Sequence, residues 1–403
     1  MGIFTSVTGG STWRTRSLPL AGRWLPAGAV ITGLALLGGA VPASAQTLTW
    51  SVVHSPNRRA GGNILNAVSC VSVSVCMATG DRANSVGALV TLAERWDGTR
   101  WSLVPSPNVG RGGNQLVAVS CVSAAACMAV GFTQGGPGGT LAERWNGTRW
   151  SVVPTPSLGG TGSDLSGVSC VAADACTAVG ATSPNGTALS TVVESWDGSR
   201  WSVVPSPNPA TGGGLSGVSC VAADACMAVG FSGSETGVHG TLAESWDGTR
   251  WSVLPTPSPG TSGNFLNGVS CVSADTCTAA GNAFHSNGPT TSLIESWDGS
   301  HWSVVPSPSP GISQTLVDGV SCAAQNACSV VGNYDTKTAI TKILVESWNG
   351  RRWSLVPTPN PGVIDHILNG VSCPSPAFCM AAGFFFSHHP NYRTLTLLGT
   401  ATG

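Results

Sequence analysis

The strongest constraint on this chain is a pair of cysteines, separated by five residues, that recurs seven times along its 403 residues. Successive pairs are 49 to 51 residues apart. A fixed period of this length indicates a repeat architecture rather than several unrelated domains. The pairs use all 14 cysteines: Cys70 and Cys76, Cys121 and Cys127, Cys170 and Cys176, Cys220 and Cys226, Cys271 and Cys277, Cys322 and Cys328, and Cys373 and Cys379.

Residues 1–45 differ in kind from the repeats. Three arginines precede an apolar run over residues 27–41, and the small residues 43–45 follow it. This order is typical of a secretory signal peptide, and the run is shorter than the roughly 20 apolar residues of a membrane span. We expect cleavage after Ala45, no membrane insertion of the mature chain, and a secreted product that is extracellular or loosely associated with the cell wall.

In an exported chain, regularly spaced cysteine pairs predict seven local disulfides. Metal sites use closer cysteine spacings or added histidines, and no histidine recurs beside these pairs. Each bridge would pin a hairpin and contribute on the order of 2 kcal/mol in the chain-entropy model. We therefore expect no metal, and no cofactor either, because the glycine-rich segment 135–139 has no helix after it to hold a phosphate.

Each repeat contains four short strand-like segments, which we name A to D in chain order. In one repeat they are residues 215–220, 226–230, 241–246 and 251–255. Four strands in about fifty residues form one blade of a β-propeller, so the sequence predicts an all-β, seven-bladed β-propeller over residues 46–403. The blade repeats are expected at 64–105, 116–154, 165–205, 215–255, 266–306, 317–357 and 368–399.

The two ends of the repeat array predict how the propeller closes. The mature chain begins with a D strand at residues 49–53, and the last repeat stops after a C strand at 394–398. We expect residues 47–54 to complete the blade of 368–399, because this three-plus-one closure removes exposed sheet edges. An open solenoid, the alternative fold, would need polar capping repeats.

Small residues mark strand A as the innermost strand, and tryptophans mark strands C and D as the outer ones. Strand A carries glycine or alanine at one position of every repeat, with serine at the next but one, which suits strands that crowd around an axis. The small residues are Ala67, Ala118, Gly167, Gly217, Gly268, Gly319 and Gly370. In six repeats a tryptophan pair, such as Trp196 and Trp201, flanks the C–D turn and is expected to pack in the sheet core.

The C–D turn, Ser-Trp-Asp-Gly-Ser-Arg-Trp at residues 195–201, and its copies resemble the Asp-box of sialidases and related secreted propellers. That box has one more residue between its Asp and its aromatic and has a structural role, so the resemblance implies fold only. The repeat length is similar to that of kelch-type propellers. The whole mature chain resembles the uncharacterised secreted Cys/Trp-repeat propellers of actinobacteria, which implies the fold and export but no activity.

Charge excludes one class of partner. Charged residues are 9% of the chain, the net charge is -1, and Lys337 and Lys342 are the two lysines, so no basic field could neutralise a run of phosphates. We expect a monomer that binds no nucleic acid.

A glutamate recurs in strand C of six repeats, and we expect these residues to pair with backbone groups or turn arginines: Glu94, Glu143, Glu194, Glu244, Glu295 and Glu346.

One face of the propeller is the candidate functional surface. The A–B and C–D turns, nearly constant in sequence, should share one face, the turn face, and the B–C and D–A loops the other, the loop face. Varied loops on a rigid scaffold are typical of binding surfaces, and aromatics beside polar groups suit sugar or peptide recognition. The ligand-binding candidates are Phe284, His285, Tyr334, Asp335, Phe385, His388, His389, Tyr392 and Arg393.

The first functional hypothesis is a secreted, non-catalytic binding module for an extracellular polysaccharide or protein. The alternatives are a carbohydrate-active hydrolase or lyase and a structural cell-envelope protein. An enzyme would draw its acid and base from Asp81, Glu235, Asp335 and Asp365, and it would need two of these carboxylates close together in different environments. No catalytic residue is assigned.

Overall fold

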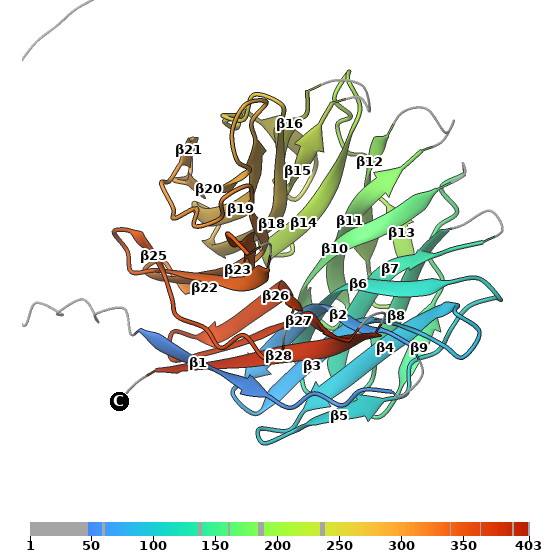
Figure 1. Cartoon of the computed structure of the whole chain (residues 1–403). Coiled ribbons are helices and arrows are strands. Elements are labelled where there is room, and N and C mark those ends of the chain that lie inside the picture. The colour runs from blue at the N-terminus through green and yellow to red at the C-terminus, as the bar shows by residue number, and fades with distance from the viewer. Residues whose placement is uncertain are drawn as a thin grey trace, which may run out of the picture. The chain divides into compact units, whose positions relative to one another are not determined.

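The computed structural model describes residues 47–58, 61–135, 139–159, 162–183, 189–233, 238–338, 340–362, 364–388 and 391–401. The expected signal peptide lies outside these residues. The described strands form seven four-stranded antiparallel sheets arranged around an axis (Figure 1). The expected all-β, seven-bladed propeller is therefore confirmed.

Three blades form the first part of the array. Blade 1 contains β2 (Asn63–Ser72), β3 (Val75–Ala83), β4 (Leu89–Trp96) and β5 (Trp101–Val104). Blade 2 contains β6 (Asn114–Ser123), β7 (Ala126–Thr133), β8 (Gly139–Trp145) and β9 (Trp150–Val153). Blade 3 contains β10 (Ser163–Ala172), β11 (Ala175–Thr182), β12 (Ser190–Trp196) and β13 (Trp201–Val203).

Four blades complete the circle. Blade 4 contains β14 (Gly213–Ala222), β15 (Ala225–Ser232), β16 (Gly240–Trp246) and β17 (Trp251–Leu254). Blade 5 contains β18 (Gly263–Ser273), β19 (Thr276–Phe284), β20 (Thr291–Trp297) and β21 (Trp302–Val304). Blade 6 contains β22 (Thr315–Ala324), β23 (Ala327–Asp335), β24 (Thr341–Trp348) and β25 (Trp353–Leu355). Blade 7 contains β26 (Ile364–Ser375), β27 (Phe378–His388), β28 (Asn391–Ala401) and, from the other end of the chain, β1 (Leu48–Val53).

The N-terminal strand closes the propeller as the sequence predicts. In Figure 1 the blue β1 lies beside the red β28, with Leu48 opposite Ala401 and Val53 opposite Thr396. Trp50 lies opposite Gly399, which occupies the strand-C position that holds tryptophan in the other blades. A Cβ at Gly399 would lie 3.0 Å from the Trp50 indole, so the glycine makes room for the ring of the incoming strand.

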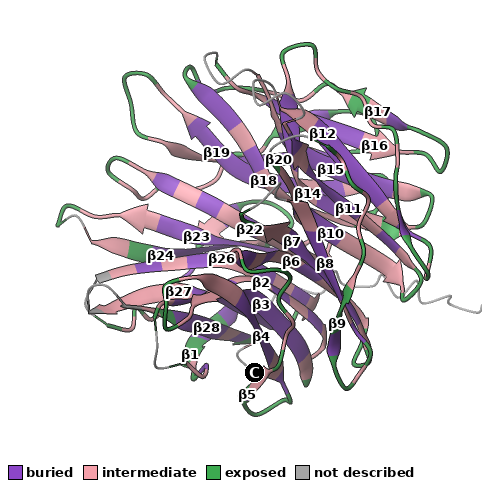
Figure 2. Cartoon of the chain, turned by 90° about the vertical axis from the view of Figure 1, so that its right-hand side faces the viewer, coloured by how far each residue is buried: buried purple, intermediate pink, exposed green. Residues whose placement is uncertain are grey.

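The hydrophobic core lies between successive blades. Each core cluster combines side chains of two neighbouring sheets, as where Met77 and Ala93 of blade 1 pack with Leu116 and Trp145 of blade 2. A cluster that contains Met380 of blade 7 and residues of blade 1 joins the two ends of the circle. Figure 2 shows the buried segments along the inner and middle strands and the exposed ones mainly in turns and loops. Burial in each blade therefore depends on the blades on either side of it.

The seven A strands approach one another closely at the axis. A Cβ on Gly167 would lie 3.0 Å from the Cα of Gly217, and one on Gly217 would lie 3.0 Å from the Cα of Gly268. This distance is shorter than van der Waals contact, so a Cβ here would require the neighbouring blade to shift slightly, and only glycine or, as at Ala67 and Ala118, alanine occupies the position. The expectation that small residues mark the innermost strand is confirmed.

A serine of each A strand joins it to the next blade. The backbone N–H of Cys121 donates to the Oγ of Ser69 at 3.0 Å, and that of Cys70 donates to Ser372 at 2.9 Å. The same bond recurs between every pair of neighbouring blades at 2.9 to 3.0 Å. We call the acceptors the axial serine ring: Ser69, Ser120, Ser169, Ser219, Ser270, Ser321 and Ser372.

The seven disulfides are confirmed, and each joins two neighbouring strands of one blade at the A–B hairpin. No cysteine is free among the described residues, and these contain every cysteine of the chain.

The tryptophan pairs that flank the C–D turns pack with their ring centroids 5.6 to 5.8 Å apart. Arg100 lies 3.6 Å from Asp97 across its turn, but both side chains are exposed, so this pair contributes little to stability.

The expectation for the recurring glutamates is wrong. They are fully buried, and several accept a hydrogen bond from a hydroxyl that follows strand D of the preceding blade. Ser106 donates to Glu143 at 2.7 Å, and Ser206 donates to Glu244 at the same distance. Each such bond ties two blades together, and the turn arginines have no part in it. Burial raises the pKa of Glu94, Glu143 and Glu346 to about 8 and that of Glu194, Glu244 and Glu295 to about 7.

These raised pKa values predict that the oxidised protein loses stability as pH rises from about 5 to about 9. The folded pKa lies above the unfolded value of 4.5, so in this interval the folded state binds more protons than the unfolded state. The contribution of these glutamates to the free energy of unfolding is complete below the unfolded pKa and is lost as pH rises through the folded pKa. Urea unfolding at pH 5, 7 and 9 measures the decline.

Glu143→Gln is the matched variant, because it keeps the shape of the side chain and an acceptor for Ser106 but cannot ionise. Its free energy of unfolding should fall less between pH 5 and pH 9 than that of the parent protein. An equal decline in both proteins would show that Glu143 is already ionised in the folded state.

Candidate binding face

The loop face is held together by backbone pairing between blades. His239, before β16, forms a parallel bridge with Gly263 of the next blade, and Thr290 forms one with Gln314. The Thr290 N–H donates to the Ser313 carbonyl, and the Thr315 N–H donates to the Thr290 carbonyl, both at 2.9 Å. The B–C loops of blades 4 and 5 are thereby fixed to the D–A segments of the blades that follow them. Side chains on these segments are presented from defined positions.

Asp335 anchors one of these segments. Its carboxylate accepts the N–H groups of Ile312, Ser313 and Gln314 at 2.9 to 3.1 Å and also the Ser313 hydroxyl. Desolvation favours the neutral carboxyl, but these hydrogen bonds outweigh it, so the pKa of Asp335 lies below its usual value. The arrangement positions a loop and keeps the carboxylate ionised.

The other proposed acids and bases also have local structural partners. Asp81 is buried and accepts the Asn66 side-chain amide at 3.1 Å, and burial raises its pKa. Asp365 has a φ of 36° and accepts the Thr341 N–H at 3.2 Å. Glu235 lies outside the described residues. Among Asp81, Asp335 and Asp365, which are described, each hydrogen bond that the structure records goes to a backbone, amide or hydroxyl group and none joins two carboxyls.

Four rings from blades 4 and 5 form a cluster at the loop face, which we call the four-ring cluster. The Phe265 ring lies 5.2 Å from that of Phe231, 4.9 Å from His239 and 5.6 Å from Phe284. All four side chains are only partly buried. Phe284 is a candidate from the sequence, whereas Phe265 was missed. The sequence does distinguish Phe265, because only this repeat has an aromatic residue just before the buried leucine or valine of strand A.

The candidates of blade 7 are divided between the two faces of its sheet. Tyr392 packs against Phe384 and Phe386, at centroid distances of 5.3 and 4.3 Å. Phe385 lies opposite Arg393 in register and stacks on His366 at 6.3 Å, against the core toward blade 6. The structure therefore does not bring Phe385 and Tyr392 together.

The remaining candidates lie at separate places. His285 follows β19, with its Nε2 at 3.3 Å from the Thr291 hydroxyl. Tyr334 is partly buried against the core between blades 5 and 6. His388 ends β27, and its side chain is not among those described. His389 lies outside the described residues.

A channel with a cavity of about 490 Å³ runs between the A strands. One residue of each strand lines it at equivalent positions, and all of these residues except Val117 are polar: Asn66, Val117, Ser166, Ser216, Asn267, Asp318 and Asn369. The three asparagines of this set each donate to a strand-A carbonyl of the next blade at 2.8 to 3.0 Å. Asp318 is the acidic member of this set, and burial raises its pKa to about 7. Aligning the repeats would have singled it out from the sequence.

In the part of the chain that the structure describes, no group of three or more His, Cys, Asp or Glu side chains could hold a metal ion. The same part contains no helix long and apolar enough to cross a membrane.

No family model and no curated protein matches the sequence. Among solved structures, YCF48 bound to D1 peptide is 12% identical, with 90% of this chain and 100% of that chain covered and a TM-score of 0.53. An ulvan lyase, a polysaccharide lyase bound to a saccharide, is 8% identical over 85% and 95% of the chains, with a TM-score of 0.54. A protein of unknown function from Dyadobacter fermentans is 9% identical over 90% and 100%, with a TM-score of 0.50. At these identities the likeness shows the propeller fold alone.

Asp318 should titrate near pH 7. Its contribution to stability is complete below the unfolded pKa of 3.8 and is lost as pH rises through about 7. The carboxyl ¹³C resonance of Asp318, assigned through Asp318→Asn, measures the pKa directly. Asp318→Asn should also be more stable than the parent at pH 8, where the parent must bury a charge. Asp97→Asn, in an exposed turn, is the control for removing a charge, and an Asp318 pKa below 5 would contradict the assignment.

Proposed function

We propose that residues 46–403, released by cleavage after Ala45, form a secreted, monomeric, non-catalytic binding module whose ligand lies across the loop-face end of the channel. The four-ring cluster is the observation that carries this proposal. Phe265 stands on β18 two residues before Asn267, which lines the channel, so the cluster lies beside the channel mouth. Large apolar rings left partly exposed together at one place are typical of interaction surfaces.

The carboxylates favour binding over catalysis. Asp335 fixes a loop through backbone N–H groups, and Asp81 is buried against Asn66. A hydrolase or lyase needs an acid and a base that share one substrate position, whereas Asp81 and Asp335 form hydrogen bonds within their own blades.

Seven disulfides, all at A–B hairpins, suit an oxidising, extracellular environment. A net charge of -1 with two lysines does not suit nucleic acid.

A protein segment is the favoured ligand. The rings of the four-ring cluster pack edge to face or tilted against one another, so they present an apolar, irregular surface that suits aliphatic side chains more than a flat sugar ring. YCF48, which shares the fold, is described with a bound D1 peptide. Carbohydrate is the second candidate, because hydroxyl and amide groups such as Ser166, Ser216 and Asn369 line the channel and such groups fix the orientation of polar ligands.

Phe265→Ala tests the proposal. Purified residues 46–403 are used to select from a phage-displayed peptide library, and they are also incubated with a panel of cell-wall and plant polysaccharides. We expect retention of a ligand without release of reducing ends, and affinity at least about tenfold lower for Phe265→Ala, as for a central aromatic anchor. Val253→Ala, at an exposed valine of the outer strand β17, is the matched control and should bind as the parent does.

Release of reducing ends would replace the binding module with the enzyme. Retention that is unchanged in Phe265→Ala would move the site away from the four-ring cluster. Failure to retain any peptide or polysaccharide would contradict the proposed binding function.

A further inference from the structure

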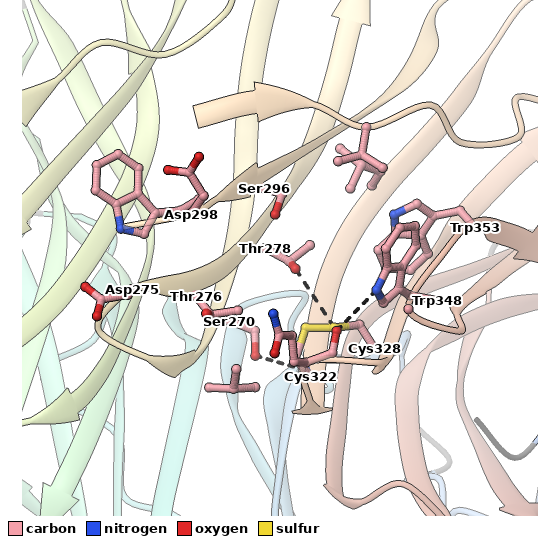
Figure 3. A pocket seen from close by; sticks show the side chains of 16 residues that line it. Ser270, Asp275, Thr276, Thr278, Ser296, Asp298, Cys322, Cys328, Trp348 and Trp353 are labelled. Atoms are coloured by element: carbon pink, nitrogen blue, oxygen red, sulfur yellow. Dashed lines mark hydrogen bonds between the residues drawn. A yellow bond between two sulfur atoms is a disulfide. The ribbon is translucent and has the colours of Figure 1, made fainter. Parts of the chain in front are cut away.

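The turn face, nearly constant in sequence, has clefts of unequal size between its blades. In each cleft the disulfide of one blade faces strands B and C of the preceding blade. The cleft between blades 2 and 3 has a volume of about 10 Å³, that between blades 4 and 5 about 110 Å³, and that between blades 5 and 6 about 270 Å³. Figure 3 shows the largest, with Thr278 and Ser296 on one side and Trp348 and Trp353 on the other.

Two lining side chains change in step with these volumes. One follows the second cysteine on strand B, the other precedes the tryptophan on strand C, and the two are opposite each other in register. They are Met128 and Arg144 in the smallest cleft, Met227 and Ser245 in the intermediate one, and Thr278 and Ser296 in the largest. From the smallest cleft to the largest, these two side chains become shorter.

The same pairs decide how far the facing indole is covered. Arg144 lies over the ring of Trp196 at 5.9 Å, and Trp196 is 4% exposed. Trp297, which faces Met227 and Ser245, is 8% exposed. Trp348, which faces Thr278 and Ser296, is partly exposed. The exposure of the indole thus increases in the same order as the volume of the cleft.

The indole of Trp246 shows the same relation between the facing residues and exposure. Blade 3 carries Thr177 and Ser195 at the two positions, and Trp246 of blade 4 is partly exposed. By contrast, Trp145 faces Met77 and Arg95 and is 3% exposed. The exposure of each of these indoles therefore follows the two residues of the preceding blade that face it.

The chemistry of the largest cleft selects a class of ligand. The indole of Trp348 offers an electron-rich surface to weakly positive C–H groups, and the hydroxyls of Thr278 and Ser296 lie across from it. Asp275 and Asp298 add carboxylates, and no lysine or arginine is among the lining residues. Hydrogen bonds from the turn, above all from the Ser300 hydroxyl, lower the pKa of Asp298 to about 2, so anionic ligands are repelled.

We propose that the cleft between blades 5 and 6 binds one neutral sugar ring, with a C–H face of the sugar on Trp348 and its hydroxyls toward Asp275, Asp298 and Ser296. The volume of about 270 Å³ is just below the roughly 300 Å³ at which drug-sized pockets begin, and so suits a single ring. Trp246, which is partly exposed and follows a blade that carries Thr177 and Ser195 at the same two positions, is a second candidate position for such a ring. Both lie on the turn face, away from the ligand of the proposed function, and do not depend on it.

The protein provides its own test variant. Thr278→Met with Ser296→Arg installs the pair that blade 2 already uses, so the blade is expected to fold and the cleft to close. Methyl glucoside, methyl galactoside and methyl mannoside are titrated into ¹⁵N-labelled protein, and the indole N–H signals are followed by NMR, with those of Trp348 and Trp246 assigned through their Phe variants. At least one glycoside should shift both signals, and the double variant should weaken the shift of Trp348 at least about tenfold while leaving that of Trp246.

The reverse exchange, Met128→Thr with Arg144→Ser, should make the Trp196 signal sensitive to the same glycoside. Phe265→Ala should leave every shift unchanged, which separates this site from the loop face. The proposal is overturned if no glycoside shifts Trp348, if the shift persists in the double variant, or if glucuronate shifts Trp348 as strongly as the neutral glycosides.

Discussion

The close approach of the seven A strands is the constraint on which the rest of the structure depends. Each strand donates one cysteine N–H to the axial serine ring, from Cys121 to Ser69 and onward to Cys70 and Ser372, where the circle closes. The bond joins A strands that lie close together, as at Gly167 and Gly217, and it also forms between blades 1 and 2, which carry Ala67 and Ala118 at this position. The order Gly-Val-Ser-Cys at residues 217–220 therefore has a physical reading: glycine permits the approach, serine joins the neighbouring blade, and cysteine pins the hairpin to the next strand.

A fixed axis leaves the outer positions free to differ. Once the inner strands and the interblade cores hold the circle, a departure from the repeat changes the local surface and leaves the fold intact. Phe265, which stands where other blades have smaller or non-aromatic residues, builds the four-ring cluster. Thr278, which stands where four of the other blades have methionine, lines the largest of the three clefts described on the turn face. In both cases the residues that differ from the repeat are the ones with a potential role in binding.

The sequence predicted what is local or periodic. Blades, strand order, disulfides and closure by residues 48–53 all follow from spacing and from the missing strands at the two ends. The bond between Ser106 and Glu143 could not be read in this way, because it joins different blades and its burial is a product of closure. Phe385 and Tyr392 lie on opposite faces of their sheet. The alternation of side chains along a strand could have indicated this, but the two residues are near each other in sequence and were therefore grouped together. The cleft at Trp348 depends on which residues face each other across blades, and spacing alone does not show this.

Hydrogen exchange of the seven A-strand cysteine amides tests the closed circle most directly. If the axial serine ring joins all blades into one cooperative unit, these amides exchange only through global unfolding and report one common free energy. Cys70, whose acceptor Ser372 lies in the last blade, should be as protected as Cys220 in the middle of the chain. Faster exchange at Cys70 and Cys373 than at Cys220 would mean that the circle opens where the N-terminal strand closes it, and would contradict the account.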